Sequence, residues 1–205
     1  MAGFYNRFVL PHLLQCGCAS PVFMRRRAGL IPRAQGEIIE VGCGGGLNFA
    51  LYDPSRVARV TGLDPSAPML AKARRLAAEA GLAAELVEGA AEALPFPDAA
   101  FDTAVLTFTL CSVADPARAL AEIRRVLRPG GQLLYCEHGL SPDAEVRRWQ
   151  ARVEPVWKVI AGGCHLTRPV GPAIRDAGFT VGEHGQGYLK APRFVGWTEW
   201  GQAAR

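Results

Sequence analysis

The stretch Glu40-Val-Gly-Cys-Gly-Gly-Gly46 decides the fold of this chain. It follows a short apolar run, Ile38-Ile39, and a second apolar run over residues 57–63 ends at Asp64. A glycine-rich turn after one strand and an acid after the next is how a parallel α/β sheet holds a nucleoside. The glycines let the backbone turn tightly and approach a ligand. The Asp64 carboxylate can accept hydrogen bonds from both hydroxyls of a ribose.

The spacing of the glycines separates this turn from the one that binds dinucleotides. The dinucleotide fingerprint is G-x-G-x-x-G, and it places a pyrophosphate at a helix N-terminus. Here Gly42, Gly44 and Gly46 follow the spacing G-x-G-x-G, and Glu40 precedes them. A carboxylate would repel a pyrophosphate but would suit a ligand with a cationic amine, such as S-adenosylmethionine. Residues 37–64 therefore resemble motif I and the following acidic position of class I methyltransferases, with a purely structural glycine turn as the alternative.

Composition bounds the architecture and the compartment. The chain has 205 residues, of which 49% are hydrophobic and 20% charged, so one α/β domain is expected rather than two large ones. It has no apolar run of the roughly 18 residues that a membrane span needs, and no signal-peptide pattern. Its six cysteines are scattered, and Cys16-Gly-Cys18 has no second pair to complete a zinc site. These features predict a cytoplasmic protein with free thiols and no bound metal.

The positive charge is concentrated before the glycine turn. Residues 1–36 contain five arginines and no acid, together with many apolar side chains. An amphipathic basic segment can lie on an anionic membrane surface, so peripheral association with the inner face of a membrane is one expectation. The alternative is a lid over the active site whose arginines are solvated. Nucleic acid is not an expected partner, because no binding motif accompanies the arginines. The oligomeric state is left open.

Strands and helices are predicted to alternate along the chain. Helices are expected at residues 3–16 and 20–31, and then at about 47–52, 66–80, 115–127, 141–160 and 169–177. Strands are expected at 37–41, 57–63, 84–87, 103–107, 132–136, 179–184 and 193–200. The last two strands are joined by residues 185–192, a connection too short for a right-handed crossover. The sequence therefore predicts one Rossmann-like domain over residues 37–205, with a seven-stranded, mostly parallel sheet, an antiparallel last strand and helices on both faces.

Further segments sharpen the resemblance. Residues 89–96 and 125–131 are similar to the quinone C-methyltransferase-like branch of the superfamily. More narrowly, residues 109–113, 137–138 and 154–168 resemble the methyltransferase-like group that includes the microsomal alkyl-thiol S-methyltransferases. Two departures stand out. Those microsomal enzymes carry a membrane-inserting N-terminal helix, whereas this chain has only the shorter basic segment. Ala90 also stands where the wider branch has an acid that meets the adenine amino group.

The resemblance implies S-adenosylmethionine as cofactor and assigns its contacts. Asp64 would hold the ribose hydroxyls and Pro65 one face of the adenine. The loop at Ala91 and Glu92 would take the adenine edge. The backbone around Gly42 and Thr107 would face the methionine portion, and Tyr5 would close over its carboxylate. Gly42, Gly44 and Gly46 are expected to bring the backbone close to the ligand, and Glu40 to suit its cationic amine.

The resemblance also implies a small apolar thiol as the methyl acceptor. His138 lies where ligands bind in such sheets, and with an ordinary pKa of about 6.5 it could remove the proton of a thiol. His165, in the segment Gly-Gly-Cys-His-Leu-Thr-Arg, is the second candidate for acceptor contact. A lipid-linked acceptor, either a phospholipid amine or a quinol ring, is the alternative within the enzyme class. A cofactor-binding regulatory subunit without catalysis is the alternative outside it.

Overall fold

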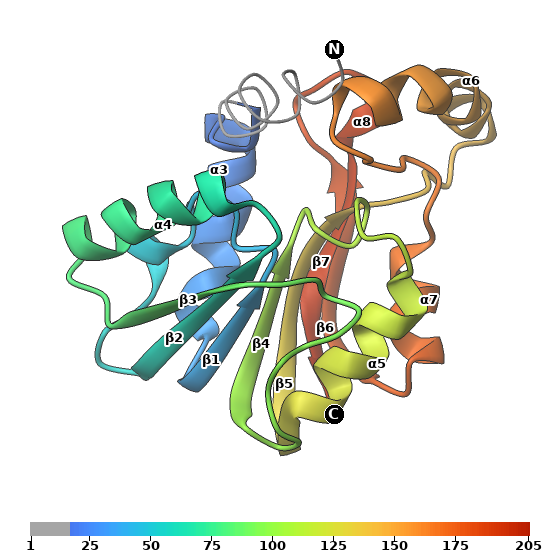
Figure 1. The fold of residues 1–205 in the computed structure, drawn as a ribbon. Coiled ribbons are helices and arrows are strands. Elements are labelled where there is room, and N and C mark those ends of the chain that lie inside the picture. The colour runs from blue at the N-terminus through green and yellow to red at the C-terminus, as the bar shows by residue number, and fades with distance from the viewer. Residues whose placement is uncertain (1–16) are drawn as a thin grey trace.

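A computed structural model describes residues 17–205 of the chain (Figure 1). Seven strands form one sheet in the order β3-β2-β1-β4-β5-β7-β6. The strands are β1 (Gly36–Val41), β2 (Val57–Asp64), β3 (Ala84–Glu88), β4 (Phe101–Thr107), β5 (Leu127–His138), β6 (Thr180–Tyr188) and β7 (Trp197–Ala204). The helices are α3 (Pro21–Leu30), α4 (Ala67–Glu79), α5 (Pro116–Val126), α6 (Ala144–Ile160), α7 (Val170–Asp176) and α8 (Arg193–Gly196), with 3₁₀ turns η2 (Ile31–Arg33) and η3 (Phe49–Leu51). The helix expected at residues 3–16 lies outside the described residues.

The pairing of the strands confirms the predicted sheet. β1 pairs in parallel with β2 and β4, and β4 pairs in parallel with β5. β7 runs antiparallel to both β5 and β6 and lies between them. The short connection after β6 allows only this reversal, because a parallel neighbour needs a crossover of a dozen or more residues.

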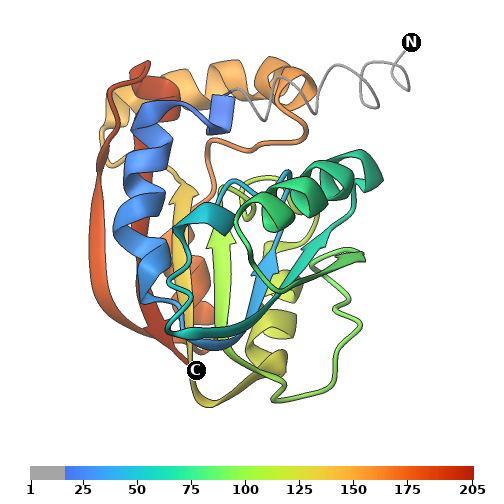
Figure 2. The same cartoon turned by 90° about the vertical axis from the view of Figure 1, so that its left-hand side faces the viewer.

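Helices cover both faces of the sheet and one of its ends. α3 and α4 lie on one face, and α5 and α7 on the other (Figure 1). α6 and α8 lie across the end at which the parallel strands finish, as Figure 2 shows from the side. Within residues 17–205, no helix is long and apolar enough to cross a membrane.

Four predicted elements are wrong in kind or extent. β5 begins at Leu127 and ends at His138, whereas the sequence predicts a strand at 132–136, and β6 continues to Tyr188, beyond the expected end at 184. The helix expected at residues 47–52 is only the 3₁₀ turn η3, because Asn48 and Tyr52 turn inward to bind Glu40 and Pro54 then stops any helix. The strand expected at 193–200 starts with the short helix α8, and β7 begins only at Trp197. Packing explains why α8 precedes β7: the ring of Phe194 in α8 packs edge to face on the ring of Trp157 in α6, with 5.8 Å between the ring centres.

Candidate functional site

A cavity of about 880 Å³ opens where the parallel strands end. The turns after β1, β2, β4 and β5 form its floor, and α3, the end of α6 and the segment around α8 close over it. This edge is where open α/β sheets bind ligands, and the volume lies in the range of ligand sites. The cavity has a polar half beside Asp64 and an apolar half beneath α6.

The glycine turn forms one wall with bare backbone. Gly42 and Gly44 line the cavity and have positive φ angles of 69° and 53°. A Cβ on Gly42 would lie 2.3 Å from the Oγ1 atom of Thr109, so no other residue fits there. Gly46 does not line the cavity. Its φ is 80° and a Cβ would lie 2.8 Å from the ring of Phe49, so it shapes the turn rather than the wall.

Asp64 lies at the mouth of the polar half with its carboxylate fixed. The Oδ2 atom accepts a hydrogen bond from the Gly44 amide at 2.9 Å, and the Oδ1 atom accepts one from the Ser66 amide at 2.9 Å. Burial raises the pKa of Asp64, and these two hydrogen bonds oppose the shift. Each oxygen keeps lone-pair capacity for a hydroxyl of a ligand, and Pro65 lines the wall beside it.

The loop after β3 provides the opposite wall of the polar half. Ala90, Ala91 and Glu92 all line the cavity. The Glu92 carboxylate accepts hydrogen bonds from the amides of Ala114 and Asp115 at 2.7 and 3.1 Å, so it ties this loop to the start of α5. Because the side chains of Ala90 and Ala91 are small, their backbone groups and methyl groups are accessible to a flat ring in the cavity.

Arg27 is the functional residue that the sequence analysis missed. It is only 5% exposed, lines the cavity, and donates hydrogen bonds to Thr107 Oγ1 at 2.6 Å and to Asn48 Oδ1 at 2.8 Å. Arg26 is also not freely solvated, since it stacks 3.6 Å from the centre of the Trp200 ring. Arg33 stays partly exposed, as expected, and pairs with Glu183 at 2.6 Å. A run of three arginines on a helix carries no signal of which one points inward.

Glu40 lies behind the cavity wall rather than in it. It is fully buried, its Oε2 atom accepts from the Tyr52 hydroxyl at 2.6 Å and its Oε1 atom accepts from Asn48 at 2.9 Å. Burial raises the pKa of Glu40 to about 7. Direct contact between Glu40 and a ligand, which the sequence predicts, is not supported by this placement. Glu40 instead positions Asn48, which also binds Arg27 and Thr107.

Aromatic and sulfur-containing side chains wall the apolar half. The ring of Phe108 packs against the rings of Phe23 and His138, and the ring centres are 4.9 Å apart in each pair. Phe108 adopts a positive φ of 55°, a strained conformation that non-glycine residues keep mainly where the surrounding structure holds them. The buried Cys111 and Cys164 also line this half, and the Cys111 thiol donates to the carbonyl of Phe108 at 3.7 Å.

His138 is the last residue of β5 and faces the apolar half of the cavity. Its Nδ1 atom is buried without a hydrogen-bond partner, while the ring is hydrogen-bonded to the backbone of Val195 and Trp197. The ordinary pKa expected from the sequence is wrong, because burial lowers the pKa of His138 to about 4. The imidazole is therefore neutral at physiological pH.

His165 does not reach the cavity. Its Nδ1 atom lies 3.2 Å from Oε1 of Glu154, and Oε2 of Glu154 accepts from the amides of Leu166 and Thr167. Its own amide donates to the carbonyl of Cys111 at 2.7 Å. His165 thus belongs to the frame that holds the roof of the cavity, and the acceptor contact predicted for it is not supported. Tyr5 lies outside the described residues, so its contact stays a prediction.

Comparisons with known proteins identify the family to which the chain belongs. Residues 39–135 match the family model described as a methyltransferase domain. The chain is 38% identical over 148 residues to the thiol S-methyltransferase TMT1B of Rattus norvegicus, an alignment that covers 70% of this chain and 59% of the relative. The chain belongs to the class I S-adenosylmethionine-dependent methyltransferases.

Two further similarities agree with this family. The methyltransferase is 42% identical over 135 residues to the phosphatidylethanolamine N-methyltransferase of Cereibacter sphaeroides, over 63% of this chain and 66% of the relative. The crystal structure of an S-adenosylmethionine-dependent methyltransferase of Thermotoga maritima, titled a possible histamine N-methyltransferase, superposes with a TM-score of 0.67. That superposition covers 99% of this chain and 97% of the other at 23% identity, so it shows the fold alone. The methyltransferase spans 59% and 66% of the lengths of the two sequence relatives.

The site of this methyltransferase fits the cofactor of its family. Within residues 17–205, the buried side-chain polar atoms without a hydrogen-bond partner are Arg27 Nε, Glu137 Oε2, His138 Nδ1 and Trp157 Nε1. Three of these four residues line the cavity. Burial shields these atoms from the cavity, so the fit to the cofactor rests on groups that line it: the Asp64 carboxylate with its free lone pairs, the bare backbone of Gly42 and Gly44, and the small residues Ala90 and Ala91. No group of metal-binding side chains occurs in the described part of the chain.

Proposed function

We propose that this methyltransferase transfers the methyl group of S-adenosylmethionine to the sulfur of a small apolar thiol. The observation that carries this proposal is the apolar half of the cavity, where Phe23 and Phe108 pack against the neutral ring of His138. Cys111 and Trp157 line the same cavity. An amine or a carboxylate would lose its hydration there without gaining a charged partner, whereas a thiol loses little. The 38% identity to a thiol S-methyltransferase supports the same acceptor.

The polar half would hold the cofactor through residues of four elements. Asp64 would accept hydrogen bonds from the ribose hydroxyls. Pro65 and the Ala90–Ala91 backbone would enclose the adenine. Arg27 would bind the methionine carboxylate, since it lines the cavity and its buried guanidinium is held by two neutral partners, Thr107 and Asn48. Glu40 would act at one remove, by fixing Asn48 against Arg27.

The bound cofactor supplies a methyl group on a sulfonium, which is already a good leaving group. The cofactor would supply this methyl group to the acceptor sulfur, and its own sulfur would keep the electron pair of the broken bond. The protein contributes positioning and exclusion of water. Phe108 and Phe23 would fix the direction of approach, and the roof that Glu154 holds would close the site.

The lowered pKa of His138 decides when it can take a proton. A free thiol has a pKa of about 8.5, so full proton transfer to an imidazole of pKa about 4 would cost roughly 6 kcal/mol before the attack. As the new bond forms, the S–H group becomes strongly acidic, and a weakly basic imidazole can then accept its proton. We therefore assign His138, whose neutral ring lines the cavity, the role of accepting this proton late in the transfer.

A lipid-linked acceptor is the second candidate. The 42% identity to a phosphatidylethanolamine N-methyltransferase favours it. A cytoplasmic location with peripheral membrane contact through residues 1–36 stays a prediction, and so does their role as a lid. Arg26, Arg27 and Arg33 already have partners within the fold, which reduces the charge that this segment could offer to lipid.

The test is release of S-adenosylhomocysteine over a panel of acceptors at one pH. Alkyl and aryl thiols should be turned over, while amines, quinols and phosphatidylethanolamine vesicles should not. Turnover of phosphatidylethanolamine or of a quinol instead would replace the thiol by a lipid-linked acceptor. Tight cofactor binding without turnover of any acceptor would support the non-catalytic alternative.

A further inference from the structure

Helix α6 carries an exposed apolar stripe. Trp149, Val156, Val159 and Ile160 are 55%, 66%, 71% and 49% exposed, and within residues 17–205 they are the large hydrophobic side chains left on the surface. At 100° per residue, positions 149, 156 and 160 fall within about 40° of one another on the helix, and Val159 lies beside them. Scattered exposed apolar residues need no explanation, but their concentration on one helix does.

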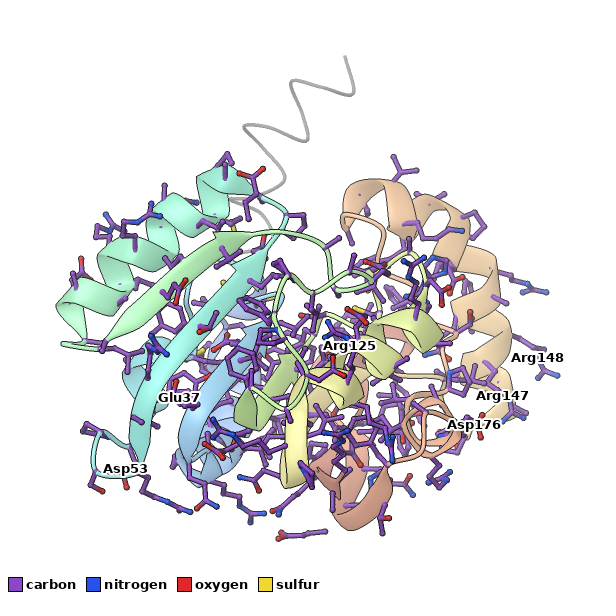
Figure 3. All side chains as sticks on the ribbon, turned by 60° about the horizontal axis from the view of Figure 1, so that its bottom comes forward. Glu37, Asp53, Arg125, Arg147, Arg148 and Asp176 are labelled. Carbon is purple, nitrogen blue, oxygen red and sulfur yellow. The ribbon has the colours of Figure 1, made fainter. Side chains whose placement is uncertain are left out.

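Basic side chains border this stripe. Arg148 and Arg152 are exposed on the side of the helix next to Val159, and the Arg152 guanidinium lies 6.0 Å from the centre of the Trp149 ring. Arg147 and Arg148 project outward from α6 (Figure 3). The helix has four basic and two acidic residues, and one of the acids, Glu154, turns inward to hold residues 165–167. The other acid, Glu145, is exposed near Trp149 in the first turn, so the stripe is bordered by Arg148 and Arg152 against one acid. The exposed side of α6 is therefore apolar with a net positive charge.

The stripe ends at the mouth of the cavity. Trp157, Ile160 and Ala161, at the C-terminal end of α6, line the cavity. At the other end, Trp149 borders a second hollow of about 790 Å³ that Val146, Val153 and Phe194 also line. A surface on which α6 lay would thus face the entrance to the apolar half of the site.

We propose that α6 docks the protein on the surface of an anionic lipid bilayer, with Trp149, Val156 and Val159 at the level of the headgroups and Arg148 and Arg152 against the lipid phosphates. A helix with a narrow apolar stripe and flanking arginines is suited to the plane of a membrane interface. Charge complementarity favours this occupant over a second copy of the chain, because a symmetric dimer would bring the arginines of both helices together. An acceptor dissolved in the lipid would then enter the cavity without crossing water.

Co-sedimentation with vesicles tests this docking. The full chain should bind vesicles that contain phosphatidylglycerol more strongly than vesicles of phosphatidylcholine alone, and binding should weaken with added salt. The triple variant Trp149→Ser/Val156→Ser/Val159→Ser and the double variant Arg148→Glu/Arg152→Glu should each bind at least about tenfold more weakly. In a Trp149→Phe variant, the blue shift of tryptophan fluorescence on binding should be largely lost.

A matched control separates α6 from the overall charge of the protein. Arg74→Glu/Arg75→Glu makes the same charge change at exposed positions of α4, and it should leave vesicle binding within about twofold of wild type. Retained affinity for S-adenosylhomocysteine shows that each variant is folded. None of these readouts needs turnover, so they are independent of which acceptor is methylated.

Three outcomes would overturn the proposal. Equal loss in the α4 control would mean that net charge alone drives binding. Equal binding by wild type and both α6 variants would place any membrane contact elsewhere, for instance in residues 1–36. Concentration-dependent self-association that the triple variant abolishes, together with no vesicle binding, would make a second copy of the chain the partner of this helix.

Discussion

The Arg27 guanidinium donates a hydrogen bond of 2.6 Å to the hydroxyl of Thr107. This contact joins the helix before the sheet to the end of β4, 80 residues later in the chain. Asn48 binds both partners and also Glu40, so one network connects α3, the glycine turn and the floor of the cavity. A charged group inside such a network is held in one orientation, which is what recognition of a carboxylate requires.

Arg27→Met should weaken binding of S-adenosylhomocysteine by about 10- to 100-fold, because a charge-assisted hydrogen bond is worth about 1.5–3 kcal/mol. Binding of 5′-methylthioadenosine, which has the same nucleoside but no carboxylate, should change by less than about threefold. Calorimetry with both ligands measures the contrast. Equal losses for the two ligands would show that Arg27 only supports the fold of the cavity.

Asp64→Ala should weaken the binding of S-adenosylhomocysteine and of 5′-methylthioadenosine alike, by about tenfold or more, because both ligands carry the ribose diol. The variant also frees the amides of Gly44 and Ser66, so thermal unfolding must be recorded alongside. 2′,3′-Dideoxy analogues, which lack both hydroxyls, should be almost insensitive to the substitution. If wild type and variant bind S-adenosylhomocysteine equally, the ribose lies elsewhere.

For His138, the dependence of the rate on pH should differ from that of an ordinary histidine. Because burial lowers its pKa to about 4, kcat for an alkyl thiol should show no histidine inflection near pH 6.5. In His138→Ala, kcat for a thiol that binds protonated should fall by about 10²–10⁴-fold. A thiol that is already ionised at the assay pH should be nearly unaffected.

His165→Ala is the matched control, since this second histidine lies outside the cavity wall and pairs with Glu154. It should leave kcat within about threefold of wild type and act on stability instead. A loss in His138→Ala that is the same for both kinds of thiol would indicate packing rather than proton transfer.

Glu40 should make stability depend on pH in a direction opposite to that of a salt-bridged acid. Its pKa is about 7 in the folded protein and ordinary, near 4.5, in the unfolded chain. The folded state therefore holds the extra proton, and stability is lost as pH rises from 4.5 to about 7. The free energy of unfolding of Glu40→Gln, relative to wild type, should rise across this window by up to about 3 kcal/mol.

Denaturant unfolding at several pH values measures this difference. Exposed Glu85 provides the control, because Glu85→Gln should shift stability by a nearly constant amount across the window. A constant offset for Glu40→Gln as well would mean that Glu40 is ionised throughout. Glu137, whose pKa burial also raises to about 7, cancels in the comparison because both proteins retain it.

The sequence by itself determined the fold, the glycine turn and the acid at the end of β2. Gly42, Gly44 and Asp64 could be read from local pattern, because positive φ angles and a strand-end acid are properties of short segments. The antiparallel last strand also followed from a short connection. These features depend on residues near one another in the chain.

Only the tertiary structure decided which groups enter the cavity and in what state. Arg27 and Arg26 are neighbours on α3, yet one reaches Thr107 and the other stacks on Trp200. His138 and His165 looked alike as candidates, but burial leaves one neutral in the cavity and a carboxylate holds the other outside it. Orientation and pKa depend on what distant segments bring within a few ångströms, and the local sequence does not contain that information.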